Sequence, residues 1–417
     1  MVRILILLAV FLFTNFATVQ AANYQLESVV VFSRHNLRAP TRTRSEIINQ
    51  LTPHKWLKWS SNFGELSIKG GELETIMGQY FRQWLTKENL IPENYIPAEG
   101  EVRFYANSYQ RTIATAQFFS SGFLPIANVK VERQFAPSRH DENFKGTLTF
   151  TNEKFNALAN EQINAALNAT DFTESFKLLE KVIDFKNSEY AKKNNLTTLV
   201  GGDTEIILKL NHGVGLKGNL DTAVGAADAL LLQYYEMENV KQASFGKKIS
   251  FNDWKKIVDI VQGYHEILLT APAVAVNVSH PLLKILNDEL SLENRKFSFI
   301  CGHDSNITPL LAALGVEKYS LPQTIETKTP IGVKFVIEKY LGEDGNEYAK
   351  LSLIYASSEQ IRNKTTLTLD NPPVIFPIRL NGLQQNSDGL YNLKDVQQRF
   401  DDAYNAYYDL QAENLAA

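Results

Sequence analysis

Short apolar segments alternate with amphipathic ones along this chain, and the alternation predicts a sheet flanked by helices. Residues 28–32, 102–106 and 297–301 are rich in β-branched and aromatic side chains, a composition typical of buried parallel strands. Polar turns follow all three segments. The second and third turns lead into helical patterns, "YQRTIATAQFF" and "ITPLLAALG". In the second, Asn107 or Ser108 suits the N-cap, which places Arg111 in the first helical turn.

The middle of the chain has a different pattern. Three segments, "NEKFNALANEQINAALNA", "DTAVGAADALLLQYYEME" and "NDWKKIVDIVQGYHEIL", carry apolar residues at helical spacing. Farther along, "VKFVIEKYLGEDGNEYAKLSLIY" predicts an antiparallel hairpin, and residues 393–415 predict a helix. We therefore expect an α/β fold with a mixed, mostly parallel sheet flanked by helices. An all-helical domain (145–270) is expected to be inserted into an α/β domain (22–144 and 271–417), with the active site in the cleft between them.

The N-terminus resembles a secretory signal peptide over residues 1–21. Arg3 precedes an apolar stretch from 4 to 13, and Val19-Gln20-Ala21 fits a signal-peptidase site. The stretch is short for a membrane span, so we expect cleavage and no membrane association of the mature chain. A lone cysteine, Cys301, permits no intramolecular disulfide. An exported protein of this size without disulfides is more typical of a bacterial periplasm.

The net charge of the chain argues against one class of partner. The formal net charge is −4, and loss of Arg3 makes it −5. Proteins that bind nucleic acids are usually basic or carry long basic stripes, so no nucleic-acid partner is expected.

Basic residues nevertheless gather at the ends of the three predicted strands. Arg34, His35 and Arg38 follow the first strand, Arg111 follows the second and His303 follows the third. Arginine in a first helical turn is unfavourable unless an anion binds there. If the strands are neighbours, these side chains converge at the carboxyl edge of the sheet. Guanidinium groups match a tetrahedral oxyanion well, so phosphate is the expected ligand.

The residue types also predict chemistry. Surrounding positive charge keeps a histidine unprotonated, which makes His35 a candidate nucleophile toward phosphorus. Asp304 is placed to protonate a leaving alcohol. The arginines supply charge neutralisation, so we expect neither a metal nor another cofactor.

These motifs resemble those of the histidine acid phosphatases, a family of the phosphoglycerate-mutase-like superfamily. Arg34-His35-x-x-Arg38-x-Pro40 with a later His303-Asp304 is the pattern that carries the resemblance. "SRHNLRAP", "GHDSNI" and "TPIG" are most similar to the periplasmic glucose-1-phosphatase branch, which is related to the bacterial acid phytases. The usual glycine after the histidine is Asn36 here.

The resemblance implies a role for each matching residue. His35 would form a phosphohistidine, and Asp304 would donate the proton. Arg34, Arg38, Arg111 and His303 would bind the phosphate of a small phosphomonoester such as glucose 1-phosphate. Asn36 is a candidate for the substrate pocket and favours a sugar phosphate.

Other interpretations stay open. A phytase shares this chemistry, and a non-catalytic sugar-phosphate binder could use the same arginines without needing Asp304. Trp56 and Trp59 could line a sugar pocket, although tryptophans near a loop more often pack beneath it. The remaining histidines show no metal-ligand spacing and are read as surface or supporting residues: His54, His140, His212, His265 and His280.

Overall fold

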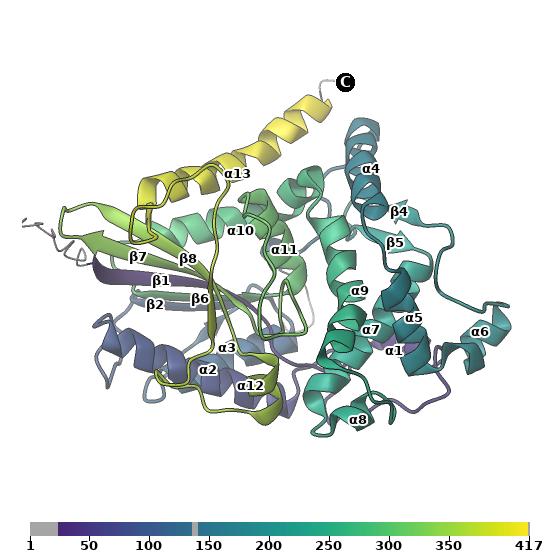
Figure 1. The fold of residues 1–417 in the computed structure, drawn as a ribbon. Coiled ribbons are helices and arrows are strands. Elements are labelled where there is room, and N and C mark those ends of the chain that lie inside the picture. Colours follow the sequence, from purple (N-terminus) through teal and green to yellow (C-terminus); the bar gives the residue numbers. More distant parts are fainter. Residues whose placement is uncertain (1–23, 136–140, 416–417) are drawn as a thin grey trace, which may run out of the picture.

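The computed structural model describes residues 24–135 and 141–415, and an eight-stranded mixed sheet organises them (Figure 1). The strand order is β10-β8-β7-β1-β6-β2-β3, with β9 paired to β8. β1, β6, β2 and β3 pair in parallel, whereas β7 to β10 pair antiparallel. The strands are β1 (Tyr24–Arg34), β2 (Val102–Ala106), β3 (Val131–Glu132), β6 (Phe297–Gly302), β7 (Lys334–Gly342), β8 (Glu347–Tyr355), β9 (Val374–Pro377) and β10 (Tyr391–Asn392).

Helices cover both faces of the sheet. Figure 1 shows α2 and α3 on one face and α10, α11 and α13 on the other. Seven consecutive residues of β1, from 28 to 34, are buried, which explains why this strand reads as an unbroken apolar run. These helices are α2 (Ile68–Lys87), α3 (Gln110–Phe123), α10 (Pro272–Leu290), α11 (Asp304–Ala313) and α13 (Leu393–Leu415); α12 (Ser358–Asn363) follows β8.

A second group of helices lies at the right of Figure 1 and has an apolar core of its own. It contains α1 (Arg42–Ile48), α4 (Glu153–Asn168), α5 (Thr173–Ile183), α6 (Glu189–Lys193), α7 (Asn219–Glu236), α8 (Val240–Ala243) and α9 (Phe251–Leu269); short 3₁₀ turns occur at Glu142–Phe144 and Phe185–Asn187. The three helices predicted from apolar spacing correspond to α4, α7 and α9. The division of the chain into domains at 144/145 and 270/271 stays a prediction.

The mixed α/β sheet flanked by helices is confirmed. One detail of the expected insert needs correction, because a two-stranded sheet accompanies its helices. β4 (Glu205–Ile207) pairs antiparallel with β5 (Gly215–Lys217). Three-residue strands are too short to show a period-two pattern, which is why the sequence did not predict them.

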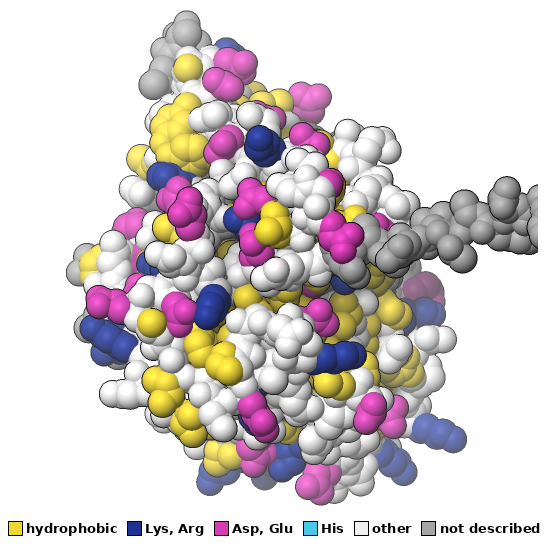
Figure 2. Space-filling view, turned by 90° about the vertical axis from the view of Figure 1, so that its left-hand side faces the viewer, with side chains coloured by type: hydrophobic (Ala, Val, Ile, Leu, Met, Phe, Trp, Pro, Cys, Tyr) yellow, Lys and Arg dark blue, Asp and Glu magenta, His cyan; other side chains and the backbone are white. Residues whose placement is uncertain are grey.

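The predicted signal peptide, residues 1–21, lies outside the described residues. Within them, no single helix has the length and apolar character needed to cross a membrane; α9 and α10 would pass together, but as a pair bent by 88°. On the face shown in Figure 2, acidic and basic side chains are interspersed, without a large patch of either sign.

Candidate active site

Three parallel strands bring the predicted site together. β6 lies between β1 and β2, and its register places Gly302 opposite Arg34 and Cys301 opposite Ala106. The expected neighbour relation is therefore confirmed. Arg111 is the second residue of α3, as predicted, but the N-cap is Tyr109 rather than Asn107 or Ser108. The side chain of Asn107 instead contacts His303.

Arg34 is fixed by two carboxylates. Its Nη2 lies 2.9 Å from Oδ2 of Asp304, and its Nη1 lies 2.8 Å from Oε1 of Glu326. Nη1 also donates to the carbonyl oxygen of Thr329, at 2.5 Å. This contact explains part of the "TPIG" motif, since the loop that carries it holds the guanidinium in place.

The His35 ring has a defined tautomer. Its Nδ1 lies 2.8 Å from the carbonyl oxygen of Asn36. A carbonyl oxygen can only accept, so Nδ1 carries the hydrogen and donates it. Nε2 then carries the lone pair. Burial, followed by the positive charges of Arg111 and its neighbours, lowers the pKa of His35 well below its ordinary value. The ring is thus a neutral imidazole with an available nitrogen.

The His303 ring and the Arg111 guanidinium lie next to each other. Oδ1 of Asn107 accepts the backbone N–H groups of Ser108 and Asp141, so its amide nitrogen donates to Nε2 of His303 at 2.8 Å. Nδ1 of the same ring lies 3.4 Å from Nη2 of Arg111, so the His303 ring joins Asn107 and Arg111 across the site.

The cluster contains positive charge and N–H groups that an anion would neutralise and bind. Burial and the proximity of Arg38 lower the pKa of Arg111 to about 10. Within the described residues, the Nε atoms of Arg34 and Arg111 are buried and have no hydrogen-bond partner. An oxyanion is the ligand that would satisfy these groups.

Asp304 and Arg38 complete the surroundings of His35. Burial alone would raise the pKa of Asp304, but Arg34 and then His265 hold it well below its usual range. Arg38 lies 3.4 Å from Oδ2 of Asp228, on α7. All six predicted charged or histidine residues thus lie at the carboxyl end of β1, β6 and β2, where the sheet meets α7 and α9.

Asn36 does not fit the predicted place in a substrate pocket. Its Nδ2 donates to Oε1 of Glu74 at 2.6 Å, and its Oδ1 accepts the N–H of Leu37 at 2.8 Å. Glu74 forms an ion pair with Lys334, and both side chains are fully buried. The polar atoms of Asn36 are therefore committed to a network behind the nucleophile, a long-range contact that the sequence does not encode locally.

A cavity of about 330 Å³ adjoins the proton-donor side of the site. It is bounded partly by α9 and by the start of α11, and its lining includes Lys145, Gly213, Tyr264, His265 and Ser305. His265 connects it to the site, because its Nδ1 lies 3.9 Å from Oδ2 of Asp304.

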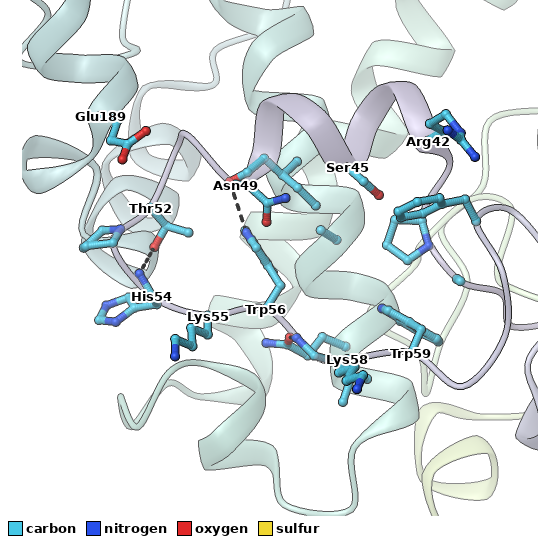
Figure 3. Close-up of a pocket in the computed structure, with 18 of the residues that line it drawn as sticks. Arg42, Ser45, Asn49, Thr52, His54, Lys55, Trp56, Lys58, Trp59 and Glu189 are labelled. Carbon is cyan, nitrogen blue, oxygen red and sulfur yellow. Dashed lines mark hydrogen bonds between the residues drawn. The ribbon is translucent and has the colours of Figure 1, made fainter.

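The tryptophans lie beside the site rather than in it. Trp56 and Trp59 line a cavity of about 1180 Å³ together with Arg42, Lys58 and Glu189 (Figure 3). The indole N–H of Trp56 donates to the carbonyl of Ile48 at 3.0 Å, and both rings also pack against the helical core. The basic and histidine cluster at the strand ends does not line this cavity.

Sequence reasoning missed Glu326 and Asp228, and it gave two other contacting residues different or vaguer roles: Asn107 as an N-cap and His265 as a surface or supporting residue. Each of the four touches a predicted residue from a distant segment. Of these, only Asn107 had a local signal, because it directly follows a predicted strand. The others lie on helices or loops whose position depends on the packed fold.

Comparisons with known proteins agree with this geometry. Residues 25–353 match the model of the histidine phosphatase superfamily (branch 2). The chain is 35% identical to a glucose-1-phosphatase of Salmonella typhimurium over 389 residues, which cover 92% of each chain. It is 32% identical to one of Providencia rettgeri over 390 residues, covering 92% of this chain and 93% of the relative.

A solved structure of a phytase has the same fold. The apo form of Hafnia alvei phytase superposes with a TM-score of 0.84 at 25% identity, covering 93% of this chain and 98% of the phytase. The family match spans most of the chain, and two relatives above 30% identity cover more than nine tenths of it. The chain therefore belongs to branch 2 of the histidine phosphatase superfamily and is a phosphomonoester hydrolase.

Proposed function

We propose that this protein is an exported, periplasmic acid phosphatase that cleaves sugar phosphates such as glucose 1-phosphate through a phosphohistidine at His35. The observation that carries the proposal is the neutral His35 ring with its free Nε2 among Arg34, Arg38 and Arg111. Residues 1–21 support export.

In this mechanism, the arginines and His303 bind the phosphoryl oxygens and orient phosphorus toward Nε2 of His35. The N–P bond forms as the bond to the leaving oxygen breaks, and Asp304 protonates that oxygen. Arg34 keeps Asp304 ionised in the free protein. A bound phosphate adds negative charge beside Asp304 and raises its proton affinity, so the acid forms when the substrate is present.

The 330 Å³ cavity supports a sugar as the leaving group. Its lining includes Ser305, which follows Asp304 in the chain, and His265, whose Nδ1 lies 3.9 Å from Oδ2 of Asp304. Among the described residues, its lining contains one lysine and no arginine: Phe144, Lys145, Gly146, Thr147, Gly213, Val214, Tyr264, His265, Leu268, Leu269 and Ser305. Such a lining suits an uncharged polyol better than the remaining phosphates of inositol hexakisphosphate.

A substrate panel tests this preference. We expect kcat/KM for glucose 1-phosphate to exceed that for phytate by at least about tenfold, because the cavity has few cations to pair with further phosphates. Phosphate release would be measured for both compounds, a nucleotide and an aryl phosphate. Faster cleavage of phytate would favour the phytase alternative.

The pH dependence of the rate constants tests the two titrating groups. The lowered pKa of His35 keeps the free nucleophile neutral at pH values well below 6.5, so kcat/KM should persist into acid. Asp304 takes its proton in the complex with substrate and loses it as the pH rises, so kcat should be at least about tenfold lower at pH 8 than at pH 5. An acid limb centred at 6.5 or above would contradict a neutral nucleophile. A profile that stayed flat to pH 9 would contradict Asp304 as the acid.

A further inference from the structure

His265 lies directly beside the carboxylate that the proposed mechanism uses as its acid. It projects from α9, and its Nδ1 is 3.9 Å from Oδ2 of Asp304. Within the described residues, this nitrogen is buried and has no hydrogen-bond partner. The same ring lines the 330 Å³ cavity, so it lies between that cavity and Asp304.

Asp304 has little capacity to hold a proton by itself. Its Oδ1 accepts the N–H of Ser305 at 2.9 Å, and its Oδ2 is paired with Arg34 at 2.9 Å. Both contacts favour the ionised carboxylate. A proton needed at the leaving oxygen is therefore better kept on a neighbouring group until the phosphate is bound.

The charges around His265 show when it would take a proton. It is influenced by Asp304 on α11, Arg34 at the end of β1, Asp228 on α7 and Arg44 on α1. Burial lowers the pKa of His265, the two carboxylates oppose this and the two arginines add to it. A phosphate anion bound at Arg34 would offset the positive field of that guanidinium, and the ring would then share a proton with Asp304.

We propose that His265 is a positioning residue that shares one proton with Asp304 and makes it available for the leaving group. The proposal rests on the proposed function, because it assigns the source of the proton used in that reaction. It adds a residue from α9 to a site otherwise built from the strand ends.

The proton balance closes over the two half-reactions. In the first, the bond between phosphorus and the leaving oxygen breaks as the bond to Nε2 of His35 forms, and the proton of the His265–Asp304 pair goes to the leaving oxygen. In the second, water attacks phosphorus as the N–P bond breaks; one proton of the water goes to the pair and the other stays on the phosphate. The enzyme regains its starting state, and the products are the alcohol and inorganic phosphate.

The test compares two substrates in His265→Gln. Glutamine keeps a polar side chain but cannot carry the proton. kcat/KM is the useful constant, because it includes departure of the leaving group and excludes hydrolysis of the phosphoenzyme. Glucose 1-phosphate needs a proton on its leaving oxygen, whereas an aryl phosphate with an acidic phenol does not.

We expect kcat/KM of His265→Gln to fall by about 10- to 100-fold for glucose 1-phosphate and by less than about threefold for the aryl ester, on the scale of general acid catalysis. The basic limb of the pH profile should shift for the sugar phosphate alone. His280→Gln is the matched control. That histidine lies on α10, stacked on Tyr407, and its replacement should leave both substrates unchanged.

Each outcome decides the question. Equal losses for both substrates would show a structural role and overturn the proposal, as would no loss for either. A wild-type protein that cleaved neither ester would overturn the proposed function and this inference with it. Retained cleavage with no substrate-dependent loss in the variant would overturn the inference alone.

A measurement on the wild-type protein remains decisive if the variant does not fold. Histidine resonances would be titrated with and without inorganic phosphate, and His265 would be assigned by through-bond experiments on the wild-type protein. We expect phosphate to raise the pH at which the His265 ring takes its proton. A titration that phosphate does not change would contradict the shared proton.

Discussion

Replacing His35 with alanine is expected to lower kcat/KM for every phosphomonoester by more than about 10³-fold, the scale on which loss of a nucleophile acts. The reason is specific to this ring. Its Nδ1–H is held by the carbonyl of Asn36, so Nε2 is a positioned lone pair that alanine cannot supply. The arginines would still bind phosphate, so the inhibition constant for inorganic phosphate should change much less than turnover.

The same variant tests the phosphoenzyme directly. Wild-type protein mixed rapidly with an aryl phosphate should form a phosphoenzyme that is stable in alkali and labile in acid, as phosphohistidine is. His35→Ala should show none. His280→Ala, which removes a half-buried histidine outside the site, should label and turn over normally. A fully active His35→Ala protein would contradict the phosphohistidine mechanism.

Asp304→Asn adds an internal check. It retains His35, so an ester with a good leaving group should still phosphorylate the protein. Hydrolysis of the phosphoenzyme should slow because water loses its proton acceptor. Phosphoenzyme should therefore accumulate in this variant and be absent from His35→Ala.

The strand-end residues were predictable because local pattern and topology act together. A buried parallel strand has a continuous apolar sequence, which makes it recognisable. Ligands of α/β sheets bind at the carboxyl ends of such strands. Once β1, β6 and β2 were placed side by side, Arg34, Arg111 and His303 had to converge. The order of the two motifs along the chain, with Arg34-His35-x-x-Arg38 before His303-Asp304, indicates the same site.

The residues that hold this cluster were not predictable in the same way. Glu326 reaches Arg34 from a loop 292 positions away, and Asp228 reaches Arg38 across 190 positions. Neither has a local pattern, since a carboxylate on a helix or loop normally faces solvent. Asn36 shows the opposite error. Its identity is unusual at this position, but its partner Glu74 is buried on α2, so the direction of its side chain has no local signal.

The network behind Asn36 leads to the second large effect, on stability. Lys334→Met is expected to lower the free energy of unfolding by about 3–5 kcal/mol near neutral pH, as breaking a buried ion pair does. Lys334 donates to both oxygens of Glu74 and to the carbonyl of Gly332, and both charged side chains have no exposed area. Methionine would leave the Glu74 carboxylate buried without its cation.

The loss should depend on pH in a direction that identifies its cause. Burial raises the pKa of Glu74, and Lys334 opposes that rise. Without the lysine, the folded-state pKa rises further above the unfolded value. Below the unfolded pKa both states hold the proton and the penalty vanishes; above the folded pKa the full penalty applies. The deficit of Lys334→Met, measured by denaturant unfolding, should therefore be smaller at pH 5 than at pH 8.

Two further variants distinguish this account from a general packing defect. Glu74→Gln combined with Lys334→Met removes both charges and keeps an oxygen that can accept from Asn36, so it should recover much of the lost stability. Lys284→Met breaks the exposed pair with Asp288 and should cost less than about 1 kcal/mol. A double variant as unstable as Lys334→Met would contradict the ion-pair explanation. The position of Gly332 explains why this network is tight. A Cβ at Gly332 would lie 2.5 Å from Nδ2 of Asn36. The chain next to His35 therefore has no room to relax around an unpaired charge.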